Sequence, residues 1–265
     1  GRDGSCIGTE CNFYIKTEGL EPVNQKVLYK ALMSKRAILE NVYVAEDGTI
    51  DLDNFEYSSN GRAVVFRGDM DSTDDKIDLP NLSILVFITR RDDVVPPIAK
   101  LTPLQAAAFF VLGESIETSA GDPTQAGKSK RVVGTNPFIV GSEAEEGNIF
   151  YDIIKGLPNL QCFVMNTGHI GGATGEKITV KDSTEIIKQI AKDKMSWTKD
   201  PFWGYLVPSN IEGIDYSRFD LKKFYSESEI LDLNKKLLEE RVEWLNKFPD
   251  LNPDIKKVFD EIYKP

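Results

Sequence analysis

The apolar run LSILVFI, Leu82–Ile88, is the feature that most constrains the fold of this chain. A membrane-spanning helix needs about 20 apolar residues, so this run is too short to span a bilayer and has the length of a strand. A strand that is apolar on both faces is typical of a sheet covered by helices on both sides. The run therefore predicts an α/β fold in which Leu82–Ile88 is a strand buried on both faces.

Further strands are predicted where short apolar segments are bounded by glycine or by polar residues. Residues 12–16 and 61–68 have this character, and so does the run Cys162–Met165. Residues 38–52 predict a hairpin: an alternating strand to Val44, a turn in which Gly48 takes a positive φ, and a return strand.

Helices are predicted from apolar spacing and from end signals. Residues 24–39 carry apolar residues at helical spacing, and we expect this helix to stop near Lys35. Four more helices have recognisable ends: a capping box of Thr102 and Gln105 with Pro103 between them, a stop at Gly156, a capping box of Asp182 and Glu185, and an amphipathic tail that begins at Ser226.

Charge and cysteine content exclude some classes of protein. The net charge of −10 argues against a surface that binds nucleic-acid backbone or anionic membrane, although a few Lys and Arg can still converge on a phosphate. The odd number of cysteines, Cys6, Cys11 and Cys162, fits a reducing cytoplasm better than a disulfide framework. With His169 the single histidine, a zinc cluster is not expected. The predicted location is cytoplasmic.

The glycine-rich stretch from Gln161 to Ile187 has the look of a phosphate loop, but its spacing fails twice. A phosphate loop places Lys directly after its last Gly and begins a helix at once. Here Glu176 separates Gly175 from Lys177, and KITVK then reads as a strand before the cap at Asp182. We expect a mobile surface loop between two strands, with His169 as a loop residue.

No repeat or low-complexity linker divides the chain, so one α/β domain is expected over residues 1–265. The polar segment Thr118–Pro137 has no evident secondary structure, and loops of this length are more often functional or mobile than inert.

The order of several segments resembles the C-terminal half of the ATP-dependent phosphoenolpyruvate carboxykinases. AILENVYVAEDGTIDLDN is similar to the family's ALLENV-V-DGTIDFDD, and NGR follows at the interval where the family has NTR. The resemblance runs from about Tyr14 to the end of the chain. Its main segments are Ala37–Asn54, Asn60–Arg62, Ile84–Gly113, Phe163–Ile187 and Gly204–Asp215.

This resemblance implies a mixed α/β nucleotide-binding domain of the carboxykinase type that is incomplete. The family's phosphate loop and its metal-binding histidine, lysine and aspartate precede these segments, and nothing in this chain matches them. The implied reaction converts oxaloacetate and ATP to phosphoenolpyruvate, CO2 and ADP, with Mg²⁺ or Mn²⁺ held by residues upstream. We expect the fragment alone to be inactive and to need the missing N-terminal part, with small molecules and not nucleic acid or membrane as partners.

The resemblance also implies site residues. Arg62, in NGR, matches the family's arginine that contacts the γ-phosphate and the substrate, and Lys16, in YIKT, matches a lysine that reaches the phosphates. Arg131 and Thr135 are the nearest equivalents of the family segment that holds the adenine end of ATP. The structural alternatives are a surface lysine for Lys16, an Arg62 paired with a neighbouring acid, and a solvated basic turn around Arg131.

Departures from the family pattern keep other functions open. NTGW is NTGH here, ending at His169, and GTECNF replaces the family's EGGC. A phosphotransferase with another substrate on the same fold is one alternative. A non-catalytic module that uses the acidic loop Asp69–Asp78 is another.

Overall fold

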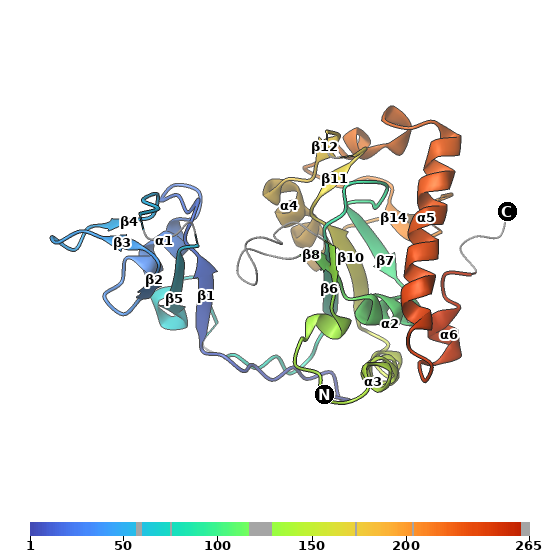
Figure 1. Ribbon diagram of the computed structural model, residues 1–265, viewed down its shortest axis with the longest axis horizontal. Helices are drawn as coiled ribbons and strands as arrows, with labels where there is room; N and C mark the ends of the chain where they lie inside the picture. Colours follow the sequence, from blue (N-terminus) through green and yellow to red (C-terminus); the bar gives the residue numbers. More distant parts are fainter. Residues whose placement is uncertain (57–59, 75, 117–128, 173, 203, 261–265) are drawn as a thin grey trace. The chain divides into compact units, whose positions relative to one another are not determined.

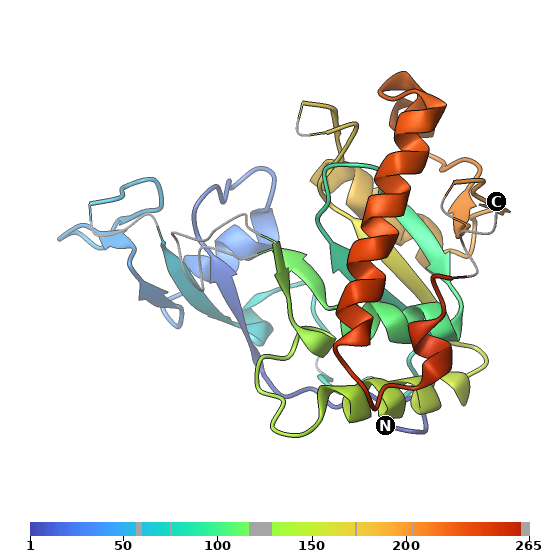
Figure 2. The same cartoon turned by 45° about the vertical axis from the view of Figure 1, so that its right-hand side comes forward.

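The computed structural model describes residues 1–56, 60–74, 76–116, 129–172, 174–202 and 204–260 (Figures 1 and 2). The described residues within 3–81 form one compact unit, and those from Leu82 onward form a second. Each unit has its own sheet and its own apolar core. That the two units together form one nucleotide-binding domain stays a prediction.

The first unit is built on a three-stranded antiparallel sheet in the order β1–β5–β2. The strands are β1 (Asn12–Lys16), β2 (Ile38–Glu40) and the central β5 (Arg62–Phe66), and the helix beside them is α1 (Lys26–Leu32). Ala63 and Val65 of β5 are buried with Ala31 and Leu32 of α1. Because side chains alternate along a strand, Arg62 and Val64 project to the other face.

The hairpin predicted over residues 38–52 is present only in part. β3 (Tyr43–Val44) pairs with β4 (Ile50–Asp51), and Gly48 has the predicted positive φ, at 85°. The single strand expected before the turn is interrupted at Asn41, whose φ is 54°. β2 consequently pairs with β5 instead of continuing the hairpin. α1 is also shorter than expected, and a single 3₁₀ turn, η1 (Arg67–Asp69), follows β5.

The second unit contains a mixed five-stranded sheet in the order β13–β14–β7–β10–β6 (Figure 1). Only β10 and β6 run parallel. The strands are β6 (Ile84–Thr89), β7 (Ile98–Leu101), β10 (Gln161–Asn166), β13 (Trp197–Lys199) and β14 (Leu206–Pro208).

Helices cover both faces of this sheet. One face packs in a large core with α2 (Pro103–Leu112), α3 (Glu143–Lys155), α5 (Glu227–Asn246) and α6 (Pro253–Lys256). The other face packs with α4 (Val180–Ala191). The predicted α/β class, with a mixed sheet flanked by helices, is therefore observed.

The smaller elements of this unit connect the layers. They are β8 (Glu114–Ile116), β9 (Ser129–Arg131), β11 (His169–Ile170), β12 (Glu176–Lys177), η3 (Val133–Thr135), η4 (Tyr216–Phe219) and η5 (Leu221–Lys223). β9 and η3 lie within the polar segment Thr118–Pro137, whose residues 118–128 fall outside the described residues.

Two sequence expectations about this unit need correction. The apolar run Leu82–Ile88 was expected to be buried on both faces, but β6 is an edge strand and the Ile88 side chain is 60% exposed. The strand that is buried from Cys162 to Asn166 is β10, one place further into the sheet. The cap of α4 lies three residues before the expected one, because Thr179 and Asp182 form the capping box. KITVK is correspondingly not a full strand, since only Lys177 belongs to β12.

Other local predictions are confirmed. The capping box of Thr102 and Gln105 starts α2, with Pro103 in its first turn. Gly156 caps α3, and Ser226 caps α5. Across the helices of the described residues, none combines the length and apolarity that a membrane crossing requires.

Candidate nucleotide and phosphate sites

Lys16 and Arg62, the two predicted phosphate ligands, lie directly opposite each other in the first unit. They are paired residues of β1 and β5. On its other side Arg62 is paired with Glu40 of β2. Directly paired residues of antiparallel strands project from the same face of the sheet. The sheet therefore lines up a lysine, an arginine and a glutamate in one row.

Arg62 is buried, with 5% of its surface exposed, and it has few partners. Its Nη1 donates to the carbonyl oxygen of Gly61 at 3.0 Å. Within the described part of the chain it forms no ion pair, so the alternative of an arginine paired with a neighbouring acid is not observed. A buried cation without a counter-ion is costly. Its planar fork is suited to two parallel hydrogen bonds from phosphate or carboxylate oxygens.

Lys16 has a different environment. Its side chain is 48% exposed, and its Nζ forms an ion pair with the carboxylate of Glu18. This arrangement fits the surface-lysine alternative, and it also leaves the ammonium free to exchange partners, because exposed ion pairs are weak.

The backbone before Arg62 is fixed by a close approach between two strands. Gly61 accepts a hydrogen bond from the backbone N–H of Thr17 at 3.1 Å. A Cβ atom on Gly61 would lie 2.3 Å from Oγ1 of Thr17, which is itself buried. A side chain at position 61 would therefore require Thr17 to shift, and the pairing of β1 with β5 sets the register that places Arg62 opposite Lys16.

Arg131 and Thr135, the predicted adenine-side residues, lie in the second unit. Arg131 ends β9 and is paired in register with Glu114 of β8. Its Nη1 lies 3.5 Å from Oε1 of Glu114, its Nη2 bonds to Glu240 of α5, and its guanidinium lies 5.7 Å from the ring centre of Trp244. Arg131 is therefore part of an ion-pair cluster, and the alternative of a solvated basic turn is not observed.

The centre of this cluster is a buried ion pair between Glu114 and Arg241. Nε of Arg241 donates to Oε1 of Glu114 at 2.7 Å, and Nη2 donates to Oε2 at 2.9 Å. Arg241 is fully buried, and its guanidinium lies 4.9 Å from the ring centre of Phe109. Arg91 joins the cluster through Glu240, 3.3 Å away. The ion pairs thereby connect the β8–β9 hairpin, α5 and the segment after β6, which are far apart in sequence.

Thr135 lines an apolar cavity of about 360 Å³ between β6, α2 and α3. Its hydroxyl donates to the carbonyl of Gly134, and both residues have positive φ. A Cβ on Gly134 would lie 2.6 Å from the ring of Phe110, so a glycine is needed there. The cavity is lined by Thr135 and Gly134, by Glu114, and by the rings of Phe87, Phe109, Phe110 and Phe150. Arg131 does not line it but contacts Glu114, which does.

The glycine-rich stretch has no free backbone donors for a phosphate among its glycines. The N–H of Gly168 donates to Oδ1 of Asn166, that of Gly171 to the carbonyl of Asp93, that of Gly172 to the carbonyl of Asp92, and that of Gly175 to the carbonyl of Gly172. The expected plain surface loop instead contains the β11–β12 hairpin.

Asn166 explains how this stretch is held. Its side chain is fully buried, and Oδ1 accepts from the backbone N–H groups of Arg91 and Gly168, both at 2.9 Å. Its Nδ2 donates to the carbonyl of Val95 at 2.8 Å. Asn166 therefore clamps the segment after β6 to the segment after β10, which is a structural role.

The described residues contain no group of three or more His, Cys, Asp and Glu that could hold a metal ion. His169 faces Asp92 alone, with Nδ1 3.2 Å from the carboxylate. Cys6 and Cys11 are exposed and free, and Cys162 is buried and free.

Apart from Arg131, the acidic and basic residues of the buried cluster were not predicted from the sequence. One signal was available: Leu237, Arg241 and Leu245 recur every four residues on the buried face of α5. An arginine in an apolar stripe needs a buried acid. Nothing in the sequence identifies Glu114, 127 residues away, as that acid.

A model of the phosphoenolpyruvate carboxykinase family matches residues 2–217. The chain belongs to the phosphoenolpyruvate carboxykinase (ATP) family. It is 35% identical over 254 residues to the phosphoenolpyruvate carboxykinase (ATP) of Aeropyrum pernix, and this alignment covers 94% of the chain and 49% of the relative.

Other relatives that carry the same name are more distant. The protein from Rhizobium rhizogenes is 27% identical over 89% of this chain and 46% of its own length. The protein from Cereibacter sphaeroides is 26% identical over 96% of this chain and 50% of its own length. This family member thus spans about half the length of the curated relatives it matches.

Replacing Arg241 should lower the free energy of unfolding of the second unit far more than replacing an exposed lysine of the same helix. Arg241→Met leaves Glu114 buried without its main partner, and we expect a loss of about 3–5 kcal/mol in the free energy of unfolding. Lys235→Met removes an exposed pair with Glu239 and should cost at most about 0.5 kcal/mol. Urea denaturation measures both. Similar losses in the two variants would contradict a central role for Arg241.

Stability should also fall in acid because of Glu114. Burial alone would raise the pKa of Glu114, but the charge and hydrogen bonds of Arg241 outweigh it and lower the pKa to about 2. Since the pKa is lower in the folded state, its contribution is complete above about pH 4.5, the ordinary value, and is lost as the pH falls toward 2. The shift corresponds to about 3 kcal/mol.

The measurement is the free energy of unfolding from urea titrations between neutral pH and about pH 3. Glu114→Gln should show a shallower decline than the unmodified chain over that window. Parallel declines would mean that other carboxylates carry the acid sensitivity.

Proposed function

We propose that the complete protein is an ATP-dependent phosphoenolpyruvate carboxykinase. In this reaction the bond between the carboxylate carbon and C3 of oxaloacetate breaks, CO2 leaves, and the electron pair remains as an enolate. The enolate oxygen then attacks the γ-phosphorus of ATP, and ADP leaves. The support is membership of the family and the names of the relatives, which cover nearly the whole chain.

The single observation that carries this proposal is the environment of Arg62. It is a buried guanidinium that meets one carbonyl and no carboxylate within the described residues. We infer that its partner is an anion, either the γ-phosphate of ATP or a carboxylate of the substrate. Negative charge on the phosphoryl oxygens and the enolate requires cations that are placed beforehand.

We assign Lys16 a supporting role at the phosphates. Two cations placed opposite each other repel, so an anion between them would stabilise both. In the ligand-free chain Glu18 balances the charge of Lys16. An incoming triphosphate would have to displace this carboxylate.

We propose that the apolar cavity next to Thr135 receives the adenine ring. Its volume lies within the range of small-molecule sites, and aromatic side chains supply flat surfaces for a planar base. The hydroxyl of Thr135 would supply a polar contact. Arg131 would lie beside the cavity without lining it, and its contacts with Glu114 and Glu240 would hold it there.

The metal of the carboxykinase reaction is not accounted for by this chain. Mg²⁺ and Mn²⁺ need several oxygen ligands, and the described residues offer no cluster of that kind. We propose that the ligands belong to the remainder of the protein. For the same reason we propose that the 265-residue chain has no turnover by itself. A cytoplasmic location, with small molecules as partners, completes the proposal.

Arg62→Ala in the complete protein should lower kcat/KM for oxaloacetate by about 10²–10³-fold, because one preorganised charge at the transferring phosphoryl group is lost. Arg36→Ala is the control, since Arg36 is an exposed arginine of the same unit, paired with Asp69. A coupled carboxykinase assay measures both, with the 265-residue chain as the sample without turnover. Full activity of Arg62→Ala would remove Arg62 from the mechanism.

Ile88→Trp tests the nucleotide cavity separately. Ile88 lines the cavity and is exposed enough for a larger side chain to enter without disturbing the core. In calorimetric titrations of the complete protein, we expect this variant to bind ATP at least about tenfold more weakly, because the indole would occupy the space of the adenine base. Ile187→Trp, at an exposed isoleucine of α4, should bind ATP normally. Equal affinities of the two variants would place the adenine elsewhere.

A further inference from the structure

Glu40 is paired with Arg62 across β2 and β5, yet its carboxylate has another partner. Directly paired residues have Cβ atoms about 5 Å apart, close enough for an ion pair between a glutamate and an arginine. Among the described residues these two side chains form no such pair. Oε2 of Glu40 instead accepts a hydrogen bond from the hydroxyl of Tyr14 at 3.0 Å. The acid that stands next to Arg62 is therefore bound by a tyrosine.

Tyr14 reaches Glu40 across the central strand of the sheet. It lies on β1 and is paired with Val64 of β5, and β5 separates β1 from β2. Tyr14 is two residues from Lys16, so it shares the face from which Lys16 and Arg62 project. Neighbouring strands are about 4.8 Å apart, so the side chains of Tyr14 and Glu40 together span about 10 Å over this face.

The hydroxyl of Tyr14 is the donor of this hydrogen bond. The bond to Glu40 raises the pKa of Tyr14 above its ordinary value, while the charge of Arg62 acts in the opposite direction. The phenol therefore keeps its proton at neutral pH. A hydrogen bond to an ionised carboxylate is stronger than one between neutral groups.

The guanidinium of Arg62 is held on the other side. Its Nη1 donates to the carbonyl of Gly61, the residue before it, whereas Tyr14 is paired with Val64, two residues after it. The bonds to Gly61 and to Tyr14 thus keep two opposite charges apart, even though Glu40 and Arg62 are paired in register.

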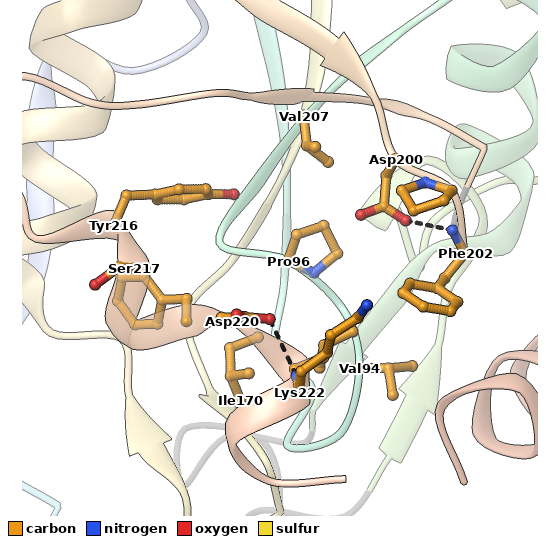
Figure 3. A pocket seen from close by; sticks show the side chains of 13 residues that line it. Val94, Pro96, Ile170, Asp200, Phe202, Val207, Tyr216, Ser217, Asp220 and Lys222 are labelled. Carbon is orange, nitrogen blue, oxygen red and sulfur yellow. Dashed lines mark hydrogen bonds between the residues drawn. The ribbon is translucent and has the colours of Figure 1, made fainter. Parts of the chain in front are cut away.

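The burial of Arg62 gives this separation a consequence. With 5% of its surface exposed, Arg62 has little water in place of a carboxylate. At the cavity of about 440 Å³ in the second unit, by contrast, Asp220 and Lys222 are exposed, so water can satisfy their charges (Figure 3). A buried guanidinium that is kept from its paired acid retains its hydrogen-bonding capacity for an anion.

We propose that Tyr14 is a positioning residue for the anion site at Arg62, because it holds Glu40 and so prevents this carboxylate from occupying the guanidinium. This inference rests on the proposed carboxykinase function, in which Arg62 meets the γ-phosphate of ATP or a carboxylate of the substrate. Without the hydroxyl of Tyr14, Glu40 turns to Arg62 and competes with that anion. Tyr14 acts through Glu40 and not by contact with the ligand.

The experiment compares the complete protein with its Tyr14→Phe, Glu40→Gln and doubly substituted variants in a coupled carboxykinase assay. Tyr14→Phe should raise KM about fivefold for ATP or for oxaloacetate, whichever contacts Arg62, because a cross-strand ion pair must then be broken. Its kcat should stay within about twofold, because a saturating ligand displaces Glu40.

The double variant is the decisive sample. Glu40→Gln should bind both ligands at least as well as the unmodified protein, because a neutral amide does not compete for the guanidinium. Tyr14→Phe combined with Glu40→Gln should therefore recover the KM of Glu40→Gln. A merely structural role of Tyr14 would not be rescued in this way.

Tyr29→Phe is the matched control. Tyr29 belongs to α1, which packs against Ala63 and Val65 on the opposite face of the sheet from Arg62. This variant should keep both kinetic constants. Circular dichroism and a cooperative thermal transition check that each variant is folded.

Crystal structures of the 265-residue chain supply a measurement that needs no activity. Glu40 should contact Tyr14 in the unmodified chain, and in Tyr14→Phe it should lie within about 4 Å of the guanidinium of Arg62. An inactive complete protein would refute the proposed function, whereas these two structures would still decide whether Tyr14 separates Glu40 from Arg62.

Four results would overturn the inference. In the crystal structures they are an ion pair between Glu40 and Arg62 in the unmodified chain, or none in Tyr14→Phe. In the active enzyme they are an unchanged KM in Tyr14→Phe, or a double variant as impaired as Tyr14→Phe, since Tyr14 would then not act through Glu40.

Discussion

A carboxylate and a guanidinium that share two hydrogen bonds inside the second unit hold its outer elements in place. Glu114 begins a hairpin just after the end of α2, and Arg241 lies in the C-terminal half of α5. Removing both charges from water is expensive, and only good geometry with further hydrogen bonds offsets that cost. Arg131 and Thr89 supply further contacts to the same carboxylate. Such a pair fixes one arrangement of helix and hairpin, because any shift leaves a charge buried and unpaired.

The first unit shows the opposite situation at Arg62. There the sheet buries a guanidinium that forms no ion pair among the described residues, although Glu40 is its paired neighbour on β2. Burying a charge is costly unless it is paired. The Glu114–Arg241 pair meets this requirement, whereas the guanidinium of Arg62 does not. This contrast between the two arginines supports the proposal that Arg62 binds an anion, whereas Arg241 has a structural role.

Local features of the fold could be predicted from the sequence, and long-range pairings could not. The cap at Thr102 was predictable because its partners lie within one helical turn. The start of α4 was misjudged because Thr179 with Asp182 and Asp182 with Glu185 both satisfy the capping pattern, and only the structure selects between them. The strand before the hairpin turn is interrupted at Asn41 because this residue has a positive φ. The spacing of apolar residues in the sequence does not reveal such a backbone angle. For the site, family motifs indicated Arg62 and Thr135, but Glu240, a partner of Arg131, lies on a helix 109 residues away.

The glycine-rich stretch after β10 has a consequence for comparisons across species. A Cβ on Gly168 would lie 2.1 Å from the carbonyl oxygen of Arg91, one on Gly171 would lie 2.3 Å from the ring of Phe224, and one on Gly175 would lie 2.0 Å from the carbonyl of Ile170. Substitution at these positions is barred by contact with the chain itself. Evolution would therefore preserve these glycines even if the loop never touched a nucleotide, and their invariance in an alignment would record steric necessity and not chemistry.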